Sequence, residues 1–262
     1  IGECHLENLG NRDGVLKAKT EMFKNACENA DFILNGDDDK LSTVKTVNGK
    51  KPVFFGLDAK NDFYAKNIKN SGDGKVLATL CFDNNNIDVE IPAIGTYMVT
   101  NALAAAAAGK LLGLTDEEIA NGVASYKTVG SRANVINTGK IKIIDDCYNA
   151  NPTSVRASLD TLSNLDGRKV AILGDMKELG SEELKLHFDT GVYAKSKDIG
   201  TVITVGELAK ELAKGADGKA FDTIEDAKPE ILKTIKSGDV VLVKASHSMQ
   251  FENIVEFLKQ NF

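Results

Sequence analysis

The sequence contains no C-x-x-C pair, no excess of basic residues and no apolar run long enough to cross a bilayer. Its cysteines are far apart, which argues against a disulfide or zinc framework and favours reduced thiols. They are Cys4, Cys27, Cys81 and Cys147. The net charge of −6 disfavours broad nucleic-acid binding, although a few lysines and a metal ion could still hold a phosphorylated small molecule. The most apolar stretch, residues 102–114, contains a lysine and is better explained as a buried helix.

The amino-terminal segment IGECHLENLGN (1–11) has neither the basic region nor the apolar core of a signal peptide. We therefore expect a cytoplasmic protein that neither enters a membrane nor binds nucleic acid. The chain of 262 residues is 42% hydrophobic and 27% charged, which is typical of a globular protein with one large domain or two ordinary ones.

Hydrophobic periodicity and turn residues divide the chain into two parts. In the first part, helical spacing alternates with short strand-like runs that are separated by turns rich in Asn, Gly and Asp. The predicted elements are a helix over 11–30, a strand over 31–35, antiparallel hairpins between 44 and 92, a helix over 98–112, and a helix after the capping-box pair Thr115 and Glu118.

After a predicted linker over 126–135, strands and helices alternate regularly. Predicted strands cover 140–144, 169–173, 201–205 and 239–243, and predicted helices cover 153–165, 181–196, 207–215, 224–236 and 249–260. This alternation predicts right-handed βαβ crossovers and a parallel sheet with helices on both faces.

Polar loops follow the predicted strands of the second part. They are residues 145–152, 174–180, 205–207 and 244–250, and three of the four are dense in charged or amide side chains. The carboxyl ends of parallel strands meet at one edge of a sheet, and ligands bind at that edge. We therefore expect the functional site there.

The stretch IIDDCYNANPTS (143–154) is the most informative of these loops. Strand alternation would turn one of Asp145 and Asp146 toward the covering helices, and a buried carboxylate needs partners or a cation. Asn151 precedes Pro152, so it fits a helix N-cap as well as it fits a binding residue.

Two nucleotide-binding motifs are missing. No predicted strand is followed by G-x-G-x-x-G, and the sequence holds no G-x-x-x-x-G-K-[ST] loop. The residues alone therefore predict an α/β protein with an acidic, amide-rich site and no complete nucleotide motif.

Six phrases nevertheless resemble one family, the Mur ligases, and they occur in the family's order across nearly the whole chain. They are IGECHLENLGNRDGVLKAKTEMF, GTYMVTNALAAAAAGKLLGLTDEEIANGV, GSR, IIDDCYNANPTSVRASLDTL, AILGDMKELG and VLVKASHSMQFENIVEFL. Among the family, DDCYNANP and LGDMKELG are most similar to the members that add D-alanyl-D-alanine to UDP-N-acetylmuramoyl-tripeptide in peptidoglycan precursor synthesis.

The resemblance implies an ATP-dependent ligase that uses Mg2+, acts on those two small-molecule substrates and is a monomer. ATP phosphorylates the tripeptide carboxylate, and the dipeptide amine attacks the acyl phosphate to form an amide and release phosphate. The implied fold is α/β. Residues 1–130 would be the later part of an ATP-binding central domain with added antiparallel strands. Residues 131–262 would be a Rossmann-like, doubly wound parallel-sheet domain.

The resemblance also assigns roles to single residues. His5 and a carbamylated Lys19 would hold Mg2+, Asn101 would contact the adenine, Arg132 would lie near the phosphates, and Asp146 would bind the ribose. His5, Lys19 and Arg132 would be the catalytic residues. Without the family, His5 would be taken as a loop or core histidine and Lys19 as a solvated helix lysine. Tyr148, Asn149, Asn151, Lys244 and Ser246 would bind the substrates.

The sequence departs from the family pattern at three positions. The family often has alanine at the position of Cys4, histidine at that of Tyr97 and arginine at that of His247. The family's amino-terminal domain and P-loop lie upstream of IGECH and are not present in this sequence. Because a P-loop cradles the phosphates, we expect this chain alone not to turn over ATP.

Three alternatives are open at this point. The chain could be a related folate-type or Mur-type amide ligase, which a substrate panel would reveal. It could be a phospho-receiver-like domain, since Asp145, Asp146, Asp175 and Lys244 mimic that acid and lysine set. It could also be a binding module that keeps the ligase fold without the chemistry.

Overall fold

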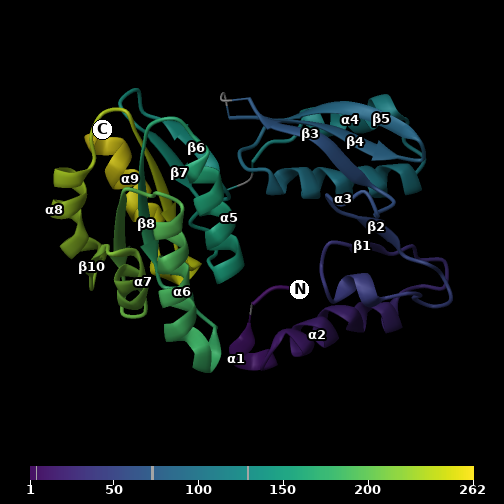
Figure 1. Cartoon of the computed structure of the whole chain (residues 1–262), viewed down its shortest axis with the longest axis horizontal. Helices are drawn as coiled ribbons and strands as arrows, with labels where there is room; N and C mark the ends of the chain where they lie inside the picture. The colour runs from purple at the N-terminus through teal and green to yellow at the C-terminus, as the bar shows by residue number, and fades with distance from the viewer. Residues whose placement is uncertain (4, 72–73, 129) are drawn as a thin grey trace. The chain divides into compact units, whose positions relative to one another are not determined.

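The computed structural model describes residues 1–3, 5–71, 74–128 and 130–262. These residues form two compact units, one made of Ile1 and Asn11–Lys127 and the other of Gly2–Gly10 and Thr128–Phe262 (Figure 1). Cys4, one of the predicted free thiols and a departure from the family pattern, lies outside the described residues. The division of the chain into domains at 130/131 stays a prediction.

The first unit contains a short parallel strand pair, an antiparallel sheet and helices. Its elements are α2 (Arg12–Asn25), β1 (Ile33–Asn35), the 3-10 helix η1 (Leu41–Thr43), β2 (Val53–Phe55), β3 (Tyr64–Asn70), β4 (Val76–Phe82), β5 (Asn85–Ile91), α3 (Tyr97–Leu111) and α4 (Asp116–Ala124). Strands β3, β4 and β5 form the predicted antiparallel sheet. The prediction was wrong for β2, which pairs in parallel with β1, because Val53 and Phe55 of β2 pack against the same core cluster as Ile33 of β1.

Helix α3 provides much of the core of the first unit. Its buried face consists largely of small residues, among them Ala102, Ala106 and Ala107, and these let its backbone approach the strands closely. Helix α4 begins at the predicted capping box, in which Thr115 and Glu118 each accept a hydrogen bond from the other's backbone N–H.

The second unit is built around one six-stranded sheet. Its elements are α1 (Leu6–Leu9), β6 (Asn134–Asn137), β7 (Lys142–Asp145), α5 (Pro152–Ser163), β8 (Arg168–Gly174), η2 (Gly180–Glu182), α6 (Glu183–Ser196), β9 (Thr201–Val205), α7 (Ala209–Ala216), β10 (Lys219–Phe221), α8 (Ile224–Thr234), β11 (Asp239–Lys244), η3 (His247–Met249) and α9 (Glu252–Asn261). The strand order is β10-β9-β8-β11-β7-β6.

Five of these strands are parallel, and β6 runs antiparallel to β7 at one edge. The predicted linker over 126–135 therefore overlaps a strand, since β6 begins at Asn134. Strand β10 was also not predicted. Both are short edge strands with little buried surface, so they carry weak hydrophobic patterns.

Helices cover both faces of this sheet (Figure 1). Helices α8 and α9 contribute Ile231, Ile254 and Leu258 to a core cluster that includes Ile143 and Val241 of the strands. Helices α5 and α6 lie on the other side of the sheet. The α/β class, with a small antiparallel sheet and a largely parallel one, is confirmed. None of the helices that the structure describes is long and apolar enough to span a membrane.

Candidate functional site

A cleft of about 380 Å³ opens at the carboxyl edge of the second unit's sheet. The loops that follow β7, β8 and β11 form it, together with the segment that carries α1. Its lining residues are His5, Tyr148, Asn149, Ala150, Asn151, Lys177, Glu178, Ser246, His247 and Ser248. The structure thus brings together five predicted site residues at the edge where the strand pattern placed the site.

Lys244 and Asp146 form a largely buried ion pair beneath the cleft. The Lys244 side chain is 3% exposed, and its Nζ lies 2.6 Å from Asp146 Oδ2. The same ammonium donates to the backbone carbonyl of Asn149 at 2.9 Å. Lys244, from the central strand β11, therefore fixes the loop that follows β7.

Asp146 joins three elements. Besides Lys244, its carboxylate accepts hydrogen bonds from Ser158 Oγ of α5 at 2.7 Å and from the backbone N–H of Ala133 at 3.1 Å. A carboxylate has about four acceptor positions, so the three bonds that described residues make leave one position on Oδ1. The neighbouring Asp145 is buried, and its Oδ1 accepts from the backbone N–H of Cys147 at 3.4 Å.

Cys147 lies beside these carboxylates in an apolar environment. Burial, reinforced by the negative charges of Asp145 and Asp146, raises the pKa of the Cys147 thiol far above its usual range. Its Sγ donates to the carbonyl of Val243 at 3.4 Å. The thiol is therefore held protonated and is not a candidate nucleophile.

The two asparagines of the loop have local roles as well as cleft positions. The side chain of Asn151 accepts a hydrogen bond from the backbone N–H of Ser154 at 2.9 Å and caps α5, with Pro152 in the first turn. The Asn149 side chain accepts from the N–H of Ala150 at 2.8 Å. The capping interpretation of Asn151 is thus correct, and the residue also lines the cleft.

Aromatic and cationic side chains stack at one end of the cleft. The Arg132 guanidinium lies 4.0 Å from the centre of the Tyr148 ring, and the His247 ring centre lies 5.9 Å from it. Tyr148 is half exposed. The arginine predicted to lie near phosphates is therefore positioned by a cation–π contact.

The loop that follows β8 supplies two cleft residues, Lys177 and Glu178, which lie inside the phrase LGDMKELG but were not predicted as site residues. The buried Asp175 accepts from Lys177 Nζ at 2.7 Å and from the backbone N–H of Ala209 at 2.8 Å. Ser246 Oγ accepts from the backbone N–H of Lys177 at 2.9 Å. The charged character of loop 174–180 was the available signal for these residues.

His5 belongs to the second unit and contacts this same loop. Its Nδ1 hydrogen-bonds with the Glu178 carboxylate, and the Glu7 N–H donates to the Glu178 carbonyl at 3.3 Å. In the neutral ring with Nδ1 donating to the carboxylate, Nε2 would be an acceptor, which is the arrangement common among metal-binding histidines.

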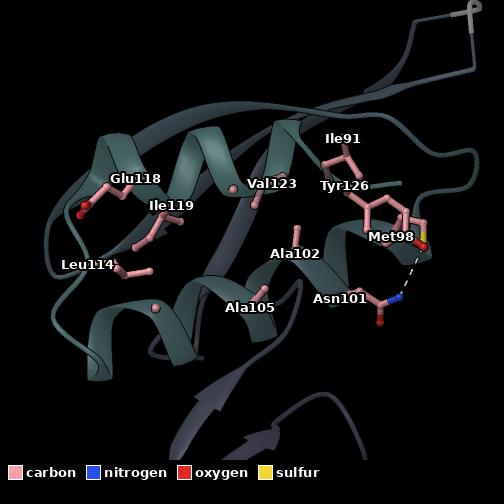
Figure 2. Close-up of a pocket in the computed structure, with 12 residues that line it drawn as sticks. Ile91, Met98, Asn101, Ala102, Ala105, Leu114, Glu118, Ile119, Val123 and Tyr126 are labelled. Atoms are coloured by element: carbon pink, nitrogen blue, oxygen red, sulfur yellow. Dashed lines mark hydrogen bonds between the residues drawn. The ribbon is translucent and has the colours of Figure 1, made fainter. Parts of the chain in front are cut away.

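Lys19 and Asn101 lie in the first unit. Lys19 is exposed on α2. Asn101 lies on α3 at the rim of an apolar pocket of about 340 Å³, and its Nδ2 is 3.4 Å from Met98 Sδ (Figure 2). Apolar side chains of α3, α4 and β5 form the walls. A pocket of this kind can bury a planar ring while the amide hydrogen-bonds its edge.

The described residues contain no cluster of three or more His, Cys, Asp or Glu side chains that could hold a metal ion. Proteins usually hold Mg2+ through one or two carboxylates together with substrate phosphates and water. His5 can offer such an ion one ring nitrogen, so the oxygen ligands would come mainly from phosphates and water.

Comparison with known proteins places the chain in a family. The model of the Mur ligase middle domain matches residues 1–109, and that of the Mur ligase glutamate ligase domain matches residues 131–247. The chain belongs to the Mur ligase family. This result argues against the phospho-receiver alternative.

The similar relatives include UDP-N-acetylmuramoyl-tripeptide–D-alanyl-D-alanine ligases. That of Bacillus subtilis is 34% identical over 98% of this chain and 57% of its own length, and that of Escherichia coli is 33% identical over 100% and 59%. Among solved structures, MurF from Acinetobacter baumannii matches with a TM-score of 0.92 at 29% identity, over 99% of this chain and 58% of its own. MurF from Thermotoga maritima, in complex with ADP, matches with a TM-score of 0.89 at 28% identity, over 100% and 60%. The chain thus spans less than two thirds of the length of each of these relatives.

Proposed function

We propose that this chain is the part of a cytoplasmic ATP-dependent ligase that joins D-alanyl-D-alanine to UDP-N-acetylmuramoyl-tripeptide in peptidoglycan precursor synthesis. The observation that carries the proposal is the cleft at the carboxyl edge of β7, β8 and β11, built on the buried Lys244–Asp146 pair. Relatives with that activity match the chain over 98–100% of its length.

In the proposed reaction, the tripeptide carboxylate attacks the γ-phosphate of ATP, which gives an acyl phosphate and ADP. The dipeptide amine then attacks the acyl carbon, and the tetrahedral intermediate collapses to an amide and inorganic phosphate as the amine loses its proton. Catalysis of this kind depends on positioning and on neutralising phosphoryl charge. Mg2+, with His5 of the second unit among its ligands, would supply part of that neutralisation.

The remaining residues have positioning roles in the proposal. Asn101 binds the edge of the adenine, and Arg132, steadied by Tyr148, faces the phosphates. Asp146 accepts from a ribose hydroxyl at the Oδ1 position that its contacts with the described residues leave open.

In the proposal, the dipeptide binds to residues of the cleft that follow β7 and β11. Tyr148, Asn149, Asn151 and Ser246 contact the dipeptide, and Lys244 holds their loop in place from below. Because Lys244 is buried and already paired, its contribution is mainly structural.

Binding of the dipeptide tests the proposal directly. We expect D-alanyl-D-alanine, titrated into the 15N-labelled chain, to shift the amide signals of Tyr148, Asn149, Asn151 and Ser246. L-Alanyl-L-alanine, which has the same composition and the opposite stereochemistry, should shift them much less. Equal shifts with both dipeptides, or shifts that lie outside the cleft, would contradict the proposal.

A further inference from the structure

A histidine outside the cleft lining lies directly behind the cleft wall. His187, on α6, is 0% exposed. Its Nε2 is 2.9 Å from the backbone nitrogen of Met176, in the loop that follows β8. Its Nδ1 is 2.7 Å from the carbonyl oxygen of Glu183, one turn earlier in the same helix.

These two partners determine the protonation of the ring. A carbonyl oxygen can only accept a hydrogen bond, so Nδ1 carries the proton. A backbone N–H can only donate, so Nε2 must be free of a proton to accept it. Only the neutral imidazole satisfies both partners, because the imidazolium would place an N–H against the Met176 N–H.

The contact bears on the cleft because of where Met176 lies. Met176 is 0% exposed, so water cannot replace a lost acceptor at its N–H. On either side of it, the Asp175 carbonyl accepts from the Ser246 N–H at 3.1 Å and the Lys177 N–H donates to Ser246 Oγ. The loop is therefore fastened to α6 through His187 and to the end of β11 through Ser246.

We propose that His187 is a positioning residue that fastens the cleft wall carrying Lys177 and Glu178 only in its neutral form, so that protonation of His187 releases this wall. The effect on ligands rests on the proposed function, whereas the effect on the loop does not.

The charges around His187 agree with a neutral ring near pH 7. Burial lowers the pKa of His187, and Lys177 acts in the same direction, while Asp175 and Glu183 oppose it. Because the folded pKa lies below the unfolded value of about 6.5, the unfolded or released form binds more protons. The fastened state is therefore fully stable above that value and loses stability as the pH falls below it.

Hydrogen exchange of the Met176 and Lys177 amides, expressed as protection factors between pH 7.5 and 5, tests the proposal. In the unaltered chain, we expect the protection of Met176 to fall by about tenfold or more over this range, since one pKa unit corresponds to a tenfold change. In His187→Gln, the amide can accept from Met176 and donate to Glu183 without titrating, so protection should not vary with pH. In His187→Phe, it should be low throughout.

Thr190→Val is the matched control. Thr190 is a buried neighbour on α6 whose hydroxyl donates to the Leu186 carbonyl and makes no hydrogen bond to the described residues of the loop, so this variant should keep the pH dependence of the unaltered chain. Protection that is constant with pH in the unaltered chain, or an unchanged pH dependence in His187→Gln, would overturn the proposal.

Titration of D-alanyl-D-alanine at pH 7.5 provides a second reading. We expect about tenfold weaker binding to His187→Phe than to the unaltered chain or to Thr190→Val. If the unaltered chain binds no dipeptide, the proposed function fails while the exchange measurement still decides the role of His187. Equal dipeptide affinity in all three would overturn the effect of His187 on the cleft.

Discussion

At the scale of single residues, loss of the buried Lys244–Asp146 pair should destabilise the second unit strongly. Lys244→Met keeps the length of the side chain but leaves the Asp146 carboxylate without its cation, so we expect a loss of about 3 kcal/mol in the free energy of unfolding. Urea denaturation followed by circular dichroism measures it. Lys259→Met, which removes the exposed pair with Glu256, should cost less than about 1 kcal/mol. Similar losses of unfolding free energy in both variants would show that the buried pair stabilises the protein no more than an exposed pair does.

Thiol reactivity provides a second prediction at this scale. Because the raised pKa keeps Cys147 protonated and the side chain is buried, iodoacetamide at pH 8 should leave it unmodified in the folded protein. Cys27 is exposed and should be alkylated readily. Peptide mass spectrometry distinguishes the two, and alkylation of Cys147 at the rate of Cys27 would contradict the burial of the Cys147 side chain.

The sequence could indicate which residue types gather at the site but not which of them pair. Asp146, Lys244 and Ser246 were predicted as site residues from the strand ends and the family phrases. Their partners depend on the order of the strands, which sets β11 beside β7 and which no local pattern encodes. His187 escaped prediction because a lone histidine inside a helix gives no signal until the loop that it holds is known.

At the scale of elements, the cap of α5 allows capping and binding to be separated. Asn151→Ala should destabilise the protein by about 1 kcal/mol, as should Thr115→Ala at the cap of α4. Asn151→Asp keeps a capping oxygen and should retain stability. If the amide contacts the dipeptide as proposed, Asn151→Asp should nevertheless weaken dipeptide binding, whereas Thr115→Ala should not. Calorimetry measures the stability of the three variants, and NMR titration measures their affinity for the dipeptide. Unweakened dipeptide binding by Asn151→Asp would contradict the proposed contact.

Close packing of α6 on α7 gives a second prediction about elements. A Cβ at Gly191 would lie 2.0 Å from the Leu212 carbonyl oxygen, so Gly191→Ala must push the helices apart and should cost about 1–3 kcal/mol. A Cβ at Gly122, inside α4, would meet no described atom within 4 Å other than the neighbouring backbone of its own helix. Gly122→Ala should therefore stabilise by about 0.5–1 kcal/mol. Thermal unfolding measures both, and a tolerated Gly191→Ala would argue against the close approach.

Long elements with strong periodicity were predictable, and short ones were not. The helices α3, α5 and α9 and the central strands of the large sheet agree with the predictions within a few residues. Helix α2 begins as predicted but ends at Asn25, five residues before the predicted end at residue 30, because Ala26 is already extended. The parallel pairing of β2 and the strands β6 and β10 were missed. Pairing direction and edge strands depend on what the rest of the fold provides, and three or four residues carry too little pattern to reveal it.

At the scale of the whole molecule, a hybrid protein tests the proposed reaction. Joining this chain to the part of the Bacillus subtilis relative that it does not match should give phosphate release that requires ATP, Mg2+, UDP-N-acetylmuramoyl-tripeptide and D-alanyl-D-alanine together. The same hybrid with Arg132→Ala should release phosphate much more slowly. A folded hybrid that forms no product with any substrate combination would favour a binding module over a ligase.

The strand order of the large sheet also has a consequence for synthesis on the ribosome. Strand β11 lies between β7 and β8, yet it is translated roughly 65–95 residues after them. Until residues 239–244 leave the exit tunnel, the inner edges of β7 and β8 have no neighbour, and exposed strand edges are prone to aggregation. The nascent second unit must therefore remain incomplete until its last parallel strand has been made. Lys244, whose pair with Asp146 fixes the loop after β7, belongs to that same strand. The central strand of the sheet and the ion pair beneath the cleft therefore form at the same stage of synthesis.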